Sequence, residues 1–129
     1  MTGRDSGECI LVIEGDPLSL KLYRDLVQSR GYGVLTAIDS ETGLDLAREH
    51  RPDLIIADAK PPERSGIEVC RALKSDARTG DIPILLLTVW PQLERAARAA
   101  GCDRFLIKPV PISTLWREVE ALIGRVAAR

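Results

Sequence analysis

The chain has 129 residues, of which 45% are hydrophobic and 29% are charged, a size and balance typical of one folded domain. Its formal net charge of -1 argues against a nucleic-acid-binding module, which normally carries a basic face. No apolar run approaches the roughly 20 residues of a membrane helix, and the polar residues 1–8 lack the apolar core of a signal peptide, so we expect a cytoplasmic protein without a membrane partner.

The cysteines do not form a recognisable site. Cys9, Cys70 and Cys102 are widely spaced and form no C-x-x-C pair, and His50 is the single histidine. This composition disfavours a zinc site and a cysteine–histidine catalytic pair. We interpret the three cysteines as reduced, buried thiols.

Apolar runs alternate with amphipathic stretches from the start of the chain. Residues 9–13 form a continuous apolar run, which is typical of a strand covered on both faces. Asp16 and Pro17 then read as a helix N-cap followed by proline in the first turn, and the helix runs to about Arg30, before Gly31. Its leucines are stacked at four-residue spacing: Leu18, Leu22 and Leu26.

The same alternation continues to the end of the chain. It predicts four further strands, at residues 34–38, 54–57, 82–87 and 105–107. It predicts helices at residues 40–50, from Ser65, at 91–100 and at 112–126. Ser65 and Glu68 have the spacing of a capping box, and the loop before them contains two prolines. The last helix carries an apolar stripe that we expect to face the core: Ile112, Leu115, Trp116, Val119, Leu122, Ile123 and Val126.

Five strand–helix units in strict alternation predict an α/β domain with a doubly wound, five-stranded parallel sheet and helices on both faces. We expect this domain to span residues 9–127, after a disordered or loosely ordered stretch at 1–8. No linker or second domain is evident.

In such a sheet, ligands bind beyond the carboxyl ends of the strands. Glu14 follows the first strand, Asp58 the third, Thr88 the fourth and Lys108 the fifth. Carboxylates, a hydroxyl and an ammonium at one edge suit phosphoryl chemistry. Asp58 could act as the nucleophile, with Lys108 neutralising phosphoryl oxygens and Thr88 donating a hydrogen bond to one of them. A second carboxylate would help to hold Mg²⁺.

Four segments in order, residues 10–17, 52–58, 82–88 and 105–109, resemble the response-regulator receiver domain of two-component systems. The resemblance covers Cys9 to Ala127 and implies the flavodoxin-like (βα)5 fold. It implies that Asp58 is the phosphoacceptor, Thr88 the switch hydroxyl, Phe105 the switch aromatic and Lys108 the phosphate-binding lysine.

The resemblance also implies partners. A histidine kinase or phosphotransfer protein would donate the phosphoryl group, with at most self-catalysed transfer and dephosphorylation rather than enzyme activity on another substrate. The face made by the fourth helix, fifth strand and fifth helix would change population between two states and bind a downstream protein, an output domain or a second copy in a homodimer. We expect no nucleic acid to bind this domain.

The acidic pair after the first strand departs from the family pattern. Mg²⁺ would be held by Glu14, Asp58 and the backbone carbonyl of Lys60, but Gly15 stands where the family usually has a second acidic ligand. Asp16 is better explained as the helix cap. The alternative to a working receiver is therefore a pseudo-receiver, a protein-interaction module that works without phosphorylation.

Two further departures concern Lys60 and Trp90. Lys60 lies two residues after Asp58, where its charge either partly replaces the cation or is merely solvated. The interval from Thr88 to Lys108 is about two residues shorter than is common in the family, and it contains Trp90. Trp90 is either an exposed anchor for a partner or a packed loop residue, whereas Trp116 is expected in the core. A nucleotide-binding enzyme is disfavoured because no glycine-rich phosphate loop is present.

Overall fold

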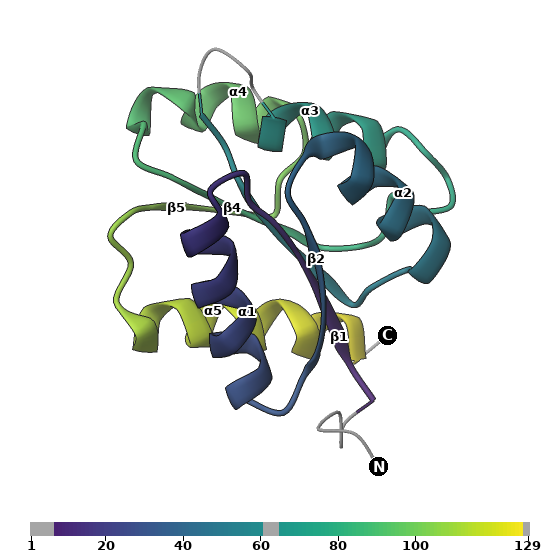
Figure 1. Ribbon diagram of the computed structural model, residues 1–129. Helices are drawn as coiled ribbons and strands as arrows, with labels where there is room; N and C mark the ends of the chain where they lie inside the picture. Colours follow the sequence, from purple (N-terminus) through teal and green to yellow (C-terminus); the bar gives the residue numbers. More distant parts are fainter. Residues whose placement is uncertain (1–6, 61–64, 128–129) are drawn as a thin grey trace.

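The computed structural model describes residues 7–60 and 65–127. Its strands are β1 (Cys9–Ile13), β2 (Gly33–Ala37), β3 (Leu54–Asp58), β4 (Ile84–Thr88) and β5 (Arg104–Ile107). Its helices are α1 (Pro17–Ser29), α2 (Ser40–His50), α3 (Ser65–Lys74), the 3₁₀ turn η1 (Pro91–Leu93), α4 (Glu94–Ala99) and α5 (Ile112–Ala127). Figure 1 shows the chain passing alternately through strands and helices, as the sequence predicts.

The strands form one parallel sheet in the order β2-β1-β3-β4-β5. The order reverses at β1, because the chain first adds β2 on one side and then continues with β3 on the other. Ile13 pairs with Ala57, so the next residues, Glu14 just beyond β1 and Asp58 at the end of β3, lie at the same edge of the sheet. Thr88 pairs with Ile107, which brings Lys108 to the same edge. The register thus gathers the polar residues predicted from the sequence.

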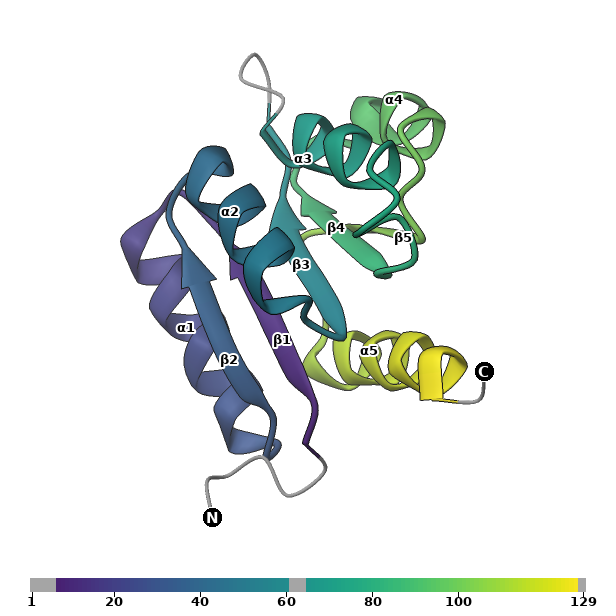
Figure 2. The ribbon, with the colours of Figure 1, turned by 90° about the vertical axis from the view of Figure 1, so that its right-hand side faces the viewer.

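Helices cover both faces of the sheet, which confirms the doubly wound fold (Figures 1 and 2). Successive residues of a strand point to opposite faces of the sheet, so a continuously apolar strand contributes side chains to the core on both faces. In the α2–α4 layer, Leu11, Ile55 and Leu86 pack with helices α2, α3 and α4. In the α1–α5 layer, Val12, Ile56 and Leu87 pack with α1 and α5.

Several predicted boundaries move. β2 ends at Ala37, and Ile38, predicted in the strand, is 50% exposed beyond it. β4 begins at Ile84 rather than Ile82, although the carbonyl of Pro83 still accepts a hydrogen bond from the Ile55 N–H at 3.0 Å. The predicted helix 91–100 divides into η1 and the six-residue α4.

The three stacked leucines of α1 do not share one environment. Leu18 is 79% exposed and Leu22 is 56% exposed. The residues of α1 that pack in the α1–α5 layer are Leu20, Tyr23, Leu26 and Val27, so Leu26 is the one of the three stacked leucines that contacts the core. The helix start is as predicted, since Asp16 Oδ2 accepts the Ser19 N–H at 2.9 Å.

The stripe of α5 is largely confirmed. Leu115, Trp116, Val119, Leu122 and Ile123 are buried in the α1–α5 layer. Ile112 is 55% exposed at the first turn, so its predicted inward position is wrong. The side chain of Val126, the last residue of the predicted stripe, lies outside the described residues.

The remaining predictions concern the thiols and the chain start. All three cysteines are free thiols. Cys70 is buried as predicted, but Cys9 and Cys102 are half-buried, so the prediction of burial is wrong for these two. The loose order expected at residues 1–6 and the prolines at 61 and 62 lie outside the described residues. Among residues 7–60 and 65–127, no helix combines the length and apolar character needed to span a membrane.

Candidate functional site

Asp58 is held at the carboxyl end of the central strand β3. Its side chain is 12% exposed. The start of α3 packs closely on it, since a Cβ placed on Gly66 would lie 2.7 Å from the Asp58 carbonyl oxygen. A side chain at position 66 would therefore displace Asp58. Sequence reasoning did not single out Gly66, because this close approach arises only in the folded chain.

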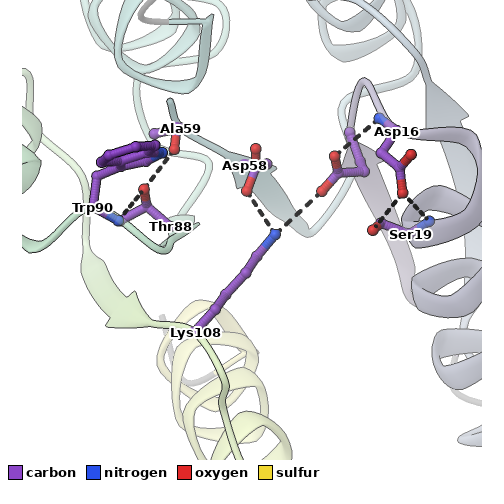
Figure 3. A network of polar contacts seen from close by, with 8 residues as sticks. Asp16, Ser19, Asp58, Ala59, Thr88, Trp90 and Lys108 are labelled. Atoms are coloured by element: carbon purple, nitrogen blue, oxygen red, sulfur yellow. Dashed lines mark hydrogen bonds and ion pairs between the residues drawn. The ribbon is translucent and has the colours of Figure 1, made fainter. Parts of the chain in front are cut away.

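Lys108 reaches the same point from the end of β5. Its backbone N–H donates to the Thr88 carbonyl at 2.7 Å, and its side chain extends toward β3 and β1 (Figure 3). Its Nζ lies 2.7 Å from Asp58 Oδ1 and 3.4 Å from Glu14 Oε1. Burial opposes the charge of the ammonium, but the hydrogen bond to Asp58 and the charges of Asp58 and Glu14 outweigh it and raise the pKa of Lys108. The lysine is therefore cationic at neutral pH.

Glu14 links the lysine to the start of α1. Its side chain is 4% exposed, and Oε2 accepts the Asp16 N–H at 3.0 Å while Oε1 faces Lys108. Asp16 itself is exposed and caps α1, accepting both the N–H and the hydroxyl of Ser19. The hydroxyl and backbone hydrogen bonds from Ser19 lower the pKa of Asp16. Glu14, and not Asp16, is thus the second carboxylate of the site.

Space exists at Gly15 for a side chain. A Cβ there would meet only the Ile38 carbonyl oxygen, at 3.6 Å, an ordinary contact distance. Among residues 7–60 and 65–127, no group of three or more histidine, cysteine, aspartate or glutamate side chains could hold a metal ion. Two carboxylates with water suit Mg²⁺, which needs few protein ligands, so the residues fit a hydrated ion held with less negative charge than three carboxylates provide.

Lys60 stands beside this site with an exposed side chain. Its charge contributes to the low pKa of Asp16, after the hydrogen bonds from Ser19. The ammonium of Lys60 therefore favours the charged form of the Asp16 carboxylate at the start of α1.

Thr88 is fully buried and its hydroxyl is engaged on both sides (Figure 3). Oγ1 donates to the Ala59 carbonyl at 2.6 Å and accepts the Trp90 N–H at 3.0 Å. The hydroxyl therefore joins the end of β3 to the loop that leads into η1. Trp90 is 41% exposed, which agrees with the exposed alternative. Sequence reasoning identified Thr88 but not its acceptor, Ala59.

Phe105 is not at the polar edge. Its side chain is 8% exposed and packs in the α2–α4 layer. The side chain named as the switch aromatic therefore lies in the core, away from the polar residues of the site.

Sequence reasoning also missed Tyr23. Lys108 Nζ lies 5.8 Å from the centroid of its ring. The ring is half-buried in the α1–α5 layer. The spacing of Leu20, Tyr23 and Val27 was the available signal, but the equally regular leucines obscured it.

The arrangement places a carboxylate, a cationic lysine and a second carboxylate at the carboxyl edge of a parallel sheet. A family model described as the response regulator receiver domain matches residues 10–120. The chain belongs to this receiver domain family. Receiver domains of two-component response regulators are signalling domains that interact with histidine kinases and downstream effectors.

Named relatives support the assignment. The chain is 35% identical over 117 residues to the polar-differentiation response regulator DivK of Brucella anthropi, covering 89% of this receiver domain chain and 95% of DivK. It is similar in structure to the chemotaxis protein CheY4 of Vibrio cholerae, with a TM-score of 0.81, 27% identity, and coverage of 90% and 98% of the two chains.

A third relative bears on metal binding. The receiver domain of sensor histidine kinase PA1611 from Pseudomonas aeruginosa superposes with a TM-score of 0.82 at 26% identity, covering 92% of this chain and 98% of the other. That protein carries a magnesium ion coordinated in its active site cleft.

Proposed function

We propose that this receiver domain accepts a phosphoryl group on Asp58 from a histidine kinase or phosphotransfer protein. The observation that carries the proposal is the 2.7 Å contact between Lys108 Nζ and Asp58 Oδ1. A carboxylate oxygen of Asp58 would attack phosphorus, the N–P bond of the phosphohistidine would break, and the imidazole would leave with its electron pair and take up a proton. The product is an acyl phosphate on Asp58.

Lys108 supports this transfer through its charge. Before transfer its ammonium bonds the Asp58 carboxylate, and after transfer the same donors can turn to the phosphoryl oxygens. Its contact with Glu14 holds the ammonium at the site during this exchange. Removing Lys108 would therefore remove neutralising charge where negative charge accumulates.

Glu14, Asp58 and the backbone carbonyl of Lys60 would hold Mg²⁺. The ion, when bound, would neutralise phosphoryl oxygens. Because Gly15 supplies no carboxylate, we propose that the ion binds weakly and that Lys60 provides part of the missing positive charge.

Thr88 would transmit the change. Its hydroxyl has one proton, now donated to the Ala59 carbonyl, so a hydrogen bond to a phosphoryl oxygen requires that bond to break. Because Thr88 Oγ1 accepts the Trp90 N–H just before η1, movement of Oγ1 would also change or break this hydrogen bond. Phosphorylation would thereby shift the population of states of the α4-β5-α5 face, where a downstream protein or output domain would bind.

The second candidate function is a pseudo-receiver, which the missing side chain at Gly15 favours. In that case the α4-β5-α5 face would bind a protein without phosphorylation. Exposed apolar residues there include Val89, Trp90, Ile107 and Ile112. Partner binding that is identical in Asp58→Asn and wild type would favour this function. The cytoplasmic location and a homodimer remain predictions from the sequence.

Phosphoramidate and intact-mass measurement test the main proposal. Wild type in Mg²⁺ is expected to gain one phosphoryl group, and Asp58→Asn none. Asp81→Asn is the matched control, because Asp81 is an exposed aspartate before β4 whose described partner is Arg51. No mass gain in wild type, with a native circular dichroism spectrum, would reject phosphorylation and leave the pseudo-receiver.

A further inference from the structure

The ring of Tyr23 faces the cation of the site. Tyr23 lies on α1 and is half-buried in the α1–α5 layer, where it packs beside the strands. Lys108 Nζ is 5.8 Å from the ring centroid, within the range of a cation–π contact. The aromatic face attracts an ammonium because it is the negative side of the ring quadrupole.

Lys108 has to be held from more than one side. Its long, flexible side chain starts at the end of β5 and crosses to β3 and β1, with 20% of it exposed. The two carboxylates bond the ammonium on one side, at 2.7 and 3.4 Å. With no carboxylate at Gly15, the aromatic ring is the remaining described contact of the ammonium.

The tyrosine remains neutral beside this charge. Burial raises the pKa of Tyr23, Lys108 lowers it, and Glu14 and Asp58 raise it further. Its ring therefore keeps the neutral, electron-rich face that a cation requires at physiological pH.

We propose that Tyr23 is a positioning residue that holds the Lys108 ammonium between Asp58 and Glu14, where it can meet an incoming phosphoryl group. The proposal rests on the proposed phosphoryl acceptance by Asp58. Tyr23 touches the lysine and not the reacting atoms, so it acts through Lys108. The aromatic ring, and not the phenolic hydroxyl, carries the effect.

Two substitutions separate the ring from the hydroxyl. Tyr23→Phe keeps the ring, whereas Tyr23→Leu keeps apolar burial in the α1–α5 layer but removes the aromatic face. Tyr32→Leu is the matched control, because Tyr32 is half-buried in the same layer but stacks on Trp116, with centroids 6.4 Å apart. Circular dichroism establishes that each variant is folded.

Two measurements are made on these proteins. The first is the affinity for beryllium fluoride in the presence of Mg²⁺. Tyr23→Leu is expected to weaken it roughly two- to fivefold, the range of an exposed cation–π contact. Tyr23→Phe and Tyr32→Leu are expected to match wild type. Unchanged affinity in Tyr23→Leu, or equal loss in Tyr23→Phe, would overturn the proposal.

The second measurement needs no phosphate mimic. In proton NMR, the ring current of residue 23 should displace the Cε methylene protons of Lys108 upfield in wild type and Tyr23→Phe, and not in Tyr23→Leu. Absence of this displacement in wild type would overturn the proposal. If wild type fails to bind beryllium fluoride, the proposed phosphorylation fails, and the NMR comparison still decides the position of Lys108.

Discussion

Lys108 Nζ and Glu14 Oε1 lie 3.4 Å apart, and the Glu14 side chain is 4% exposed. This nearly buried ion pair fixes the one carboxylate that β1 contributes to the site, while Gly15, the next residue, contributes none. Three charged groups therefore meet at the site, the ammonium of Lys108 and the carboxylates of Asp58 and Glu14.

Restoring a carboxylate at position 15 should strengthen Mg²⁺ binding. Gly15→Asp has room, because a Cβ meets only the Ile38 carbonyl oxygen, at 3.6 Å. One added negative charge within about 4 Å of a divalent ion should raise its affinity at least about tenfold, even at high dielectric. Isothermal titration calorimetry with MgCl₂ measures this, and Gly15→Ala serves as control. Equal affinity in the aspartate and alanine variants would show that the missing carboxylate does not limit metal binding.

Lys60→Ala tests whether a loop lysine substitutes for part of the metal charge. Removing the ammonium should increase Mg²⁺ affinity roughly two- to threefold, as suits an exposed charge, and weaken beryllium fluoride binding at low Mg²⁺. Lys21→Ala is the control, since Lys21 is an exposed lysine that pairs with Asp25 on α1. If both affinities equal those of wild type, Lys60 is a solvated lysine with no part in the site.

Thr88→Val should reduce the stability of the unphosphorylated domain. Valine keeps the shape but leaves the Ala59 carbonyl and the Trp90 N–H without their hydroxyl partner. Loss of these bonds at a fully buried position should cost about 1–3 kcal/mol in the free energy of unfolding. Urea denaturation followed by circular dichroism measures it, and Thr88→Ser should recover much of the loss. A valine variant as stable as wild type would contradict the described role of the hydroxyl.

Cys70 should give the domain a recognisable loss of stability in alkali. Burial raises the pKa of this thiol from 9.0 to about 12. Above pH 9 the unfolded thiol loses its proton while the folded one keeps it, so stability falls as pH rises, by up to about 1.4 kcal/mol per pH unit from this group. Below pH 9 the thiol is protonated in both the folded and the unfolded state, so it adds no pH dependence to the stability.

The comparison of wild type with Cys70→Ala isolates that contribution. Tyrosines and lysines titrate in both proteins, so their effect on stability cancels in the comparison. Between pH 8 and 11, the denaturation midpoint should fall more steeply with pH in wild type, because only wild type has the Cys70 thiol. Parallel pH profiles would show that the thiol is accessible in the native state.

The fold was predictable because its signals are local. Continuous apolar runs at β1, β3 and β4 indicate strands buried on both faces, and alternation with helices then leaves few topologies. The same topology gathers Glu14, Asp58, Thr88 and Lys108 at one edge, although their chemical roles are not fixed by position alone.

Other features depend on contacts that spacing does not encode. α1 is apolar on two sides, and packing against the sheet selects Tyr23 and Val27 rather than Leu18 and Leu22. Gly66 matters only because α3 approaches the Asp58 carbonyl, and Ala59 only because Thr88 bonds it. Pro91 occupies the first position of η1, where its missing N–H costs nothing, and the spacing of the following residues does not encode the change from the 3₁₀ turn to α4 at Glu94.

The central claim is that Asp58 receives a phosphoryl group and that Thr88 and Trp90 report it. Beryllium fluoride titrated in Mg²⁺, with tryptophan fluorescence as the signal, tests this directly because Trp90 is exposed and its N–H bonds the Thr88 hydroxyl. We predict a saturable change that is absent from Asp58→Asn and from Trp90→Phe. A folded wild type that shows no response, or a response that Asp58→Asn retains, would contradict the account.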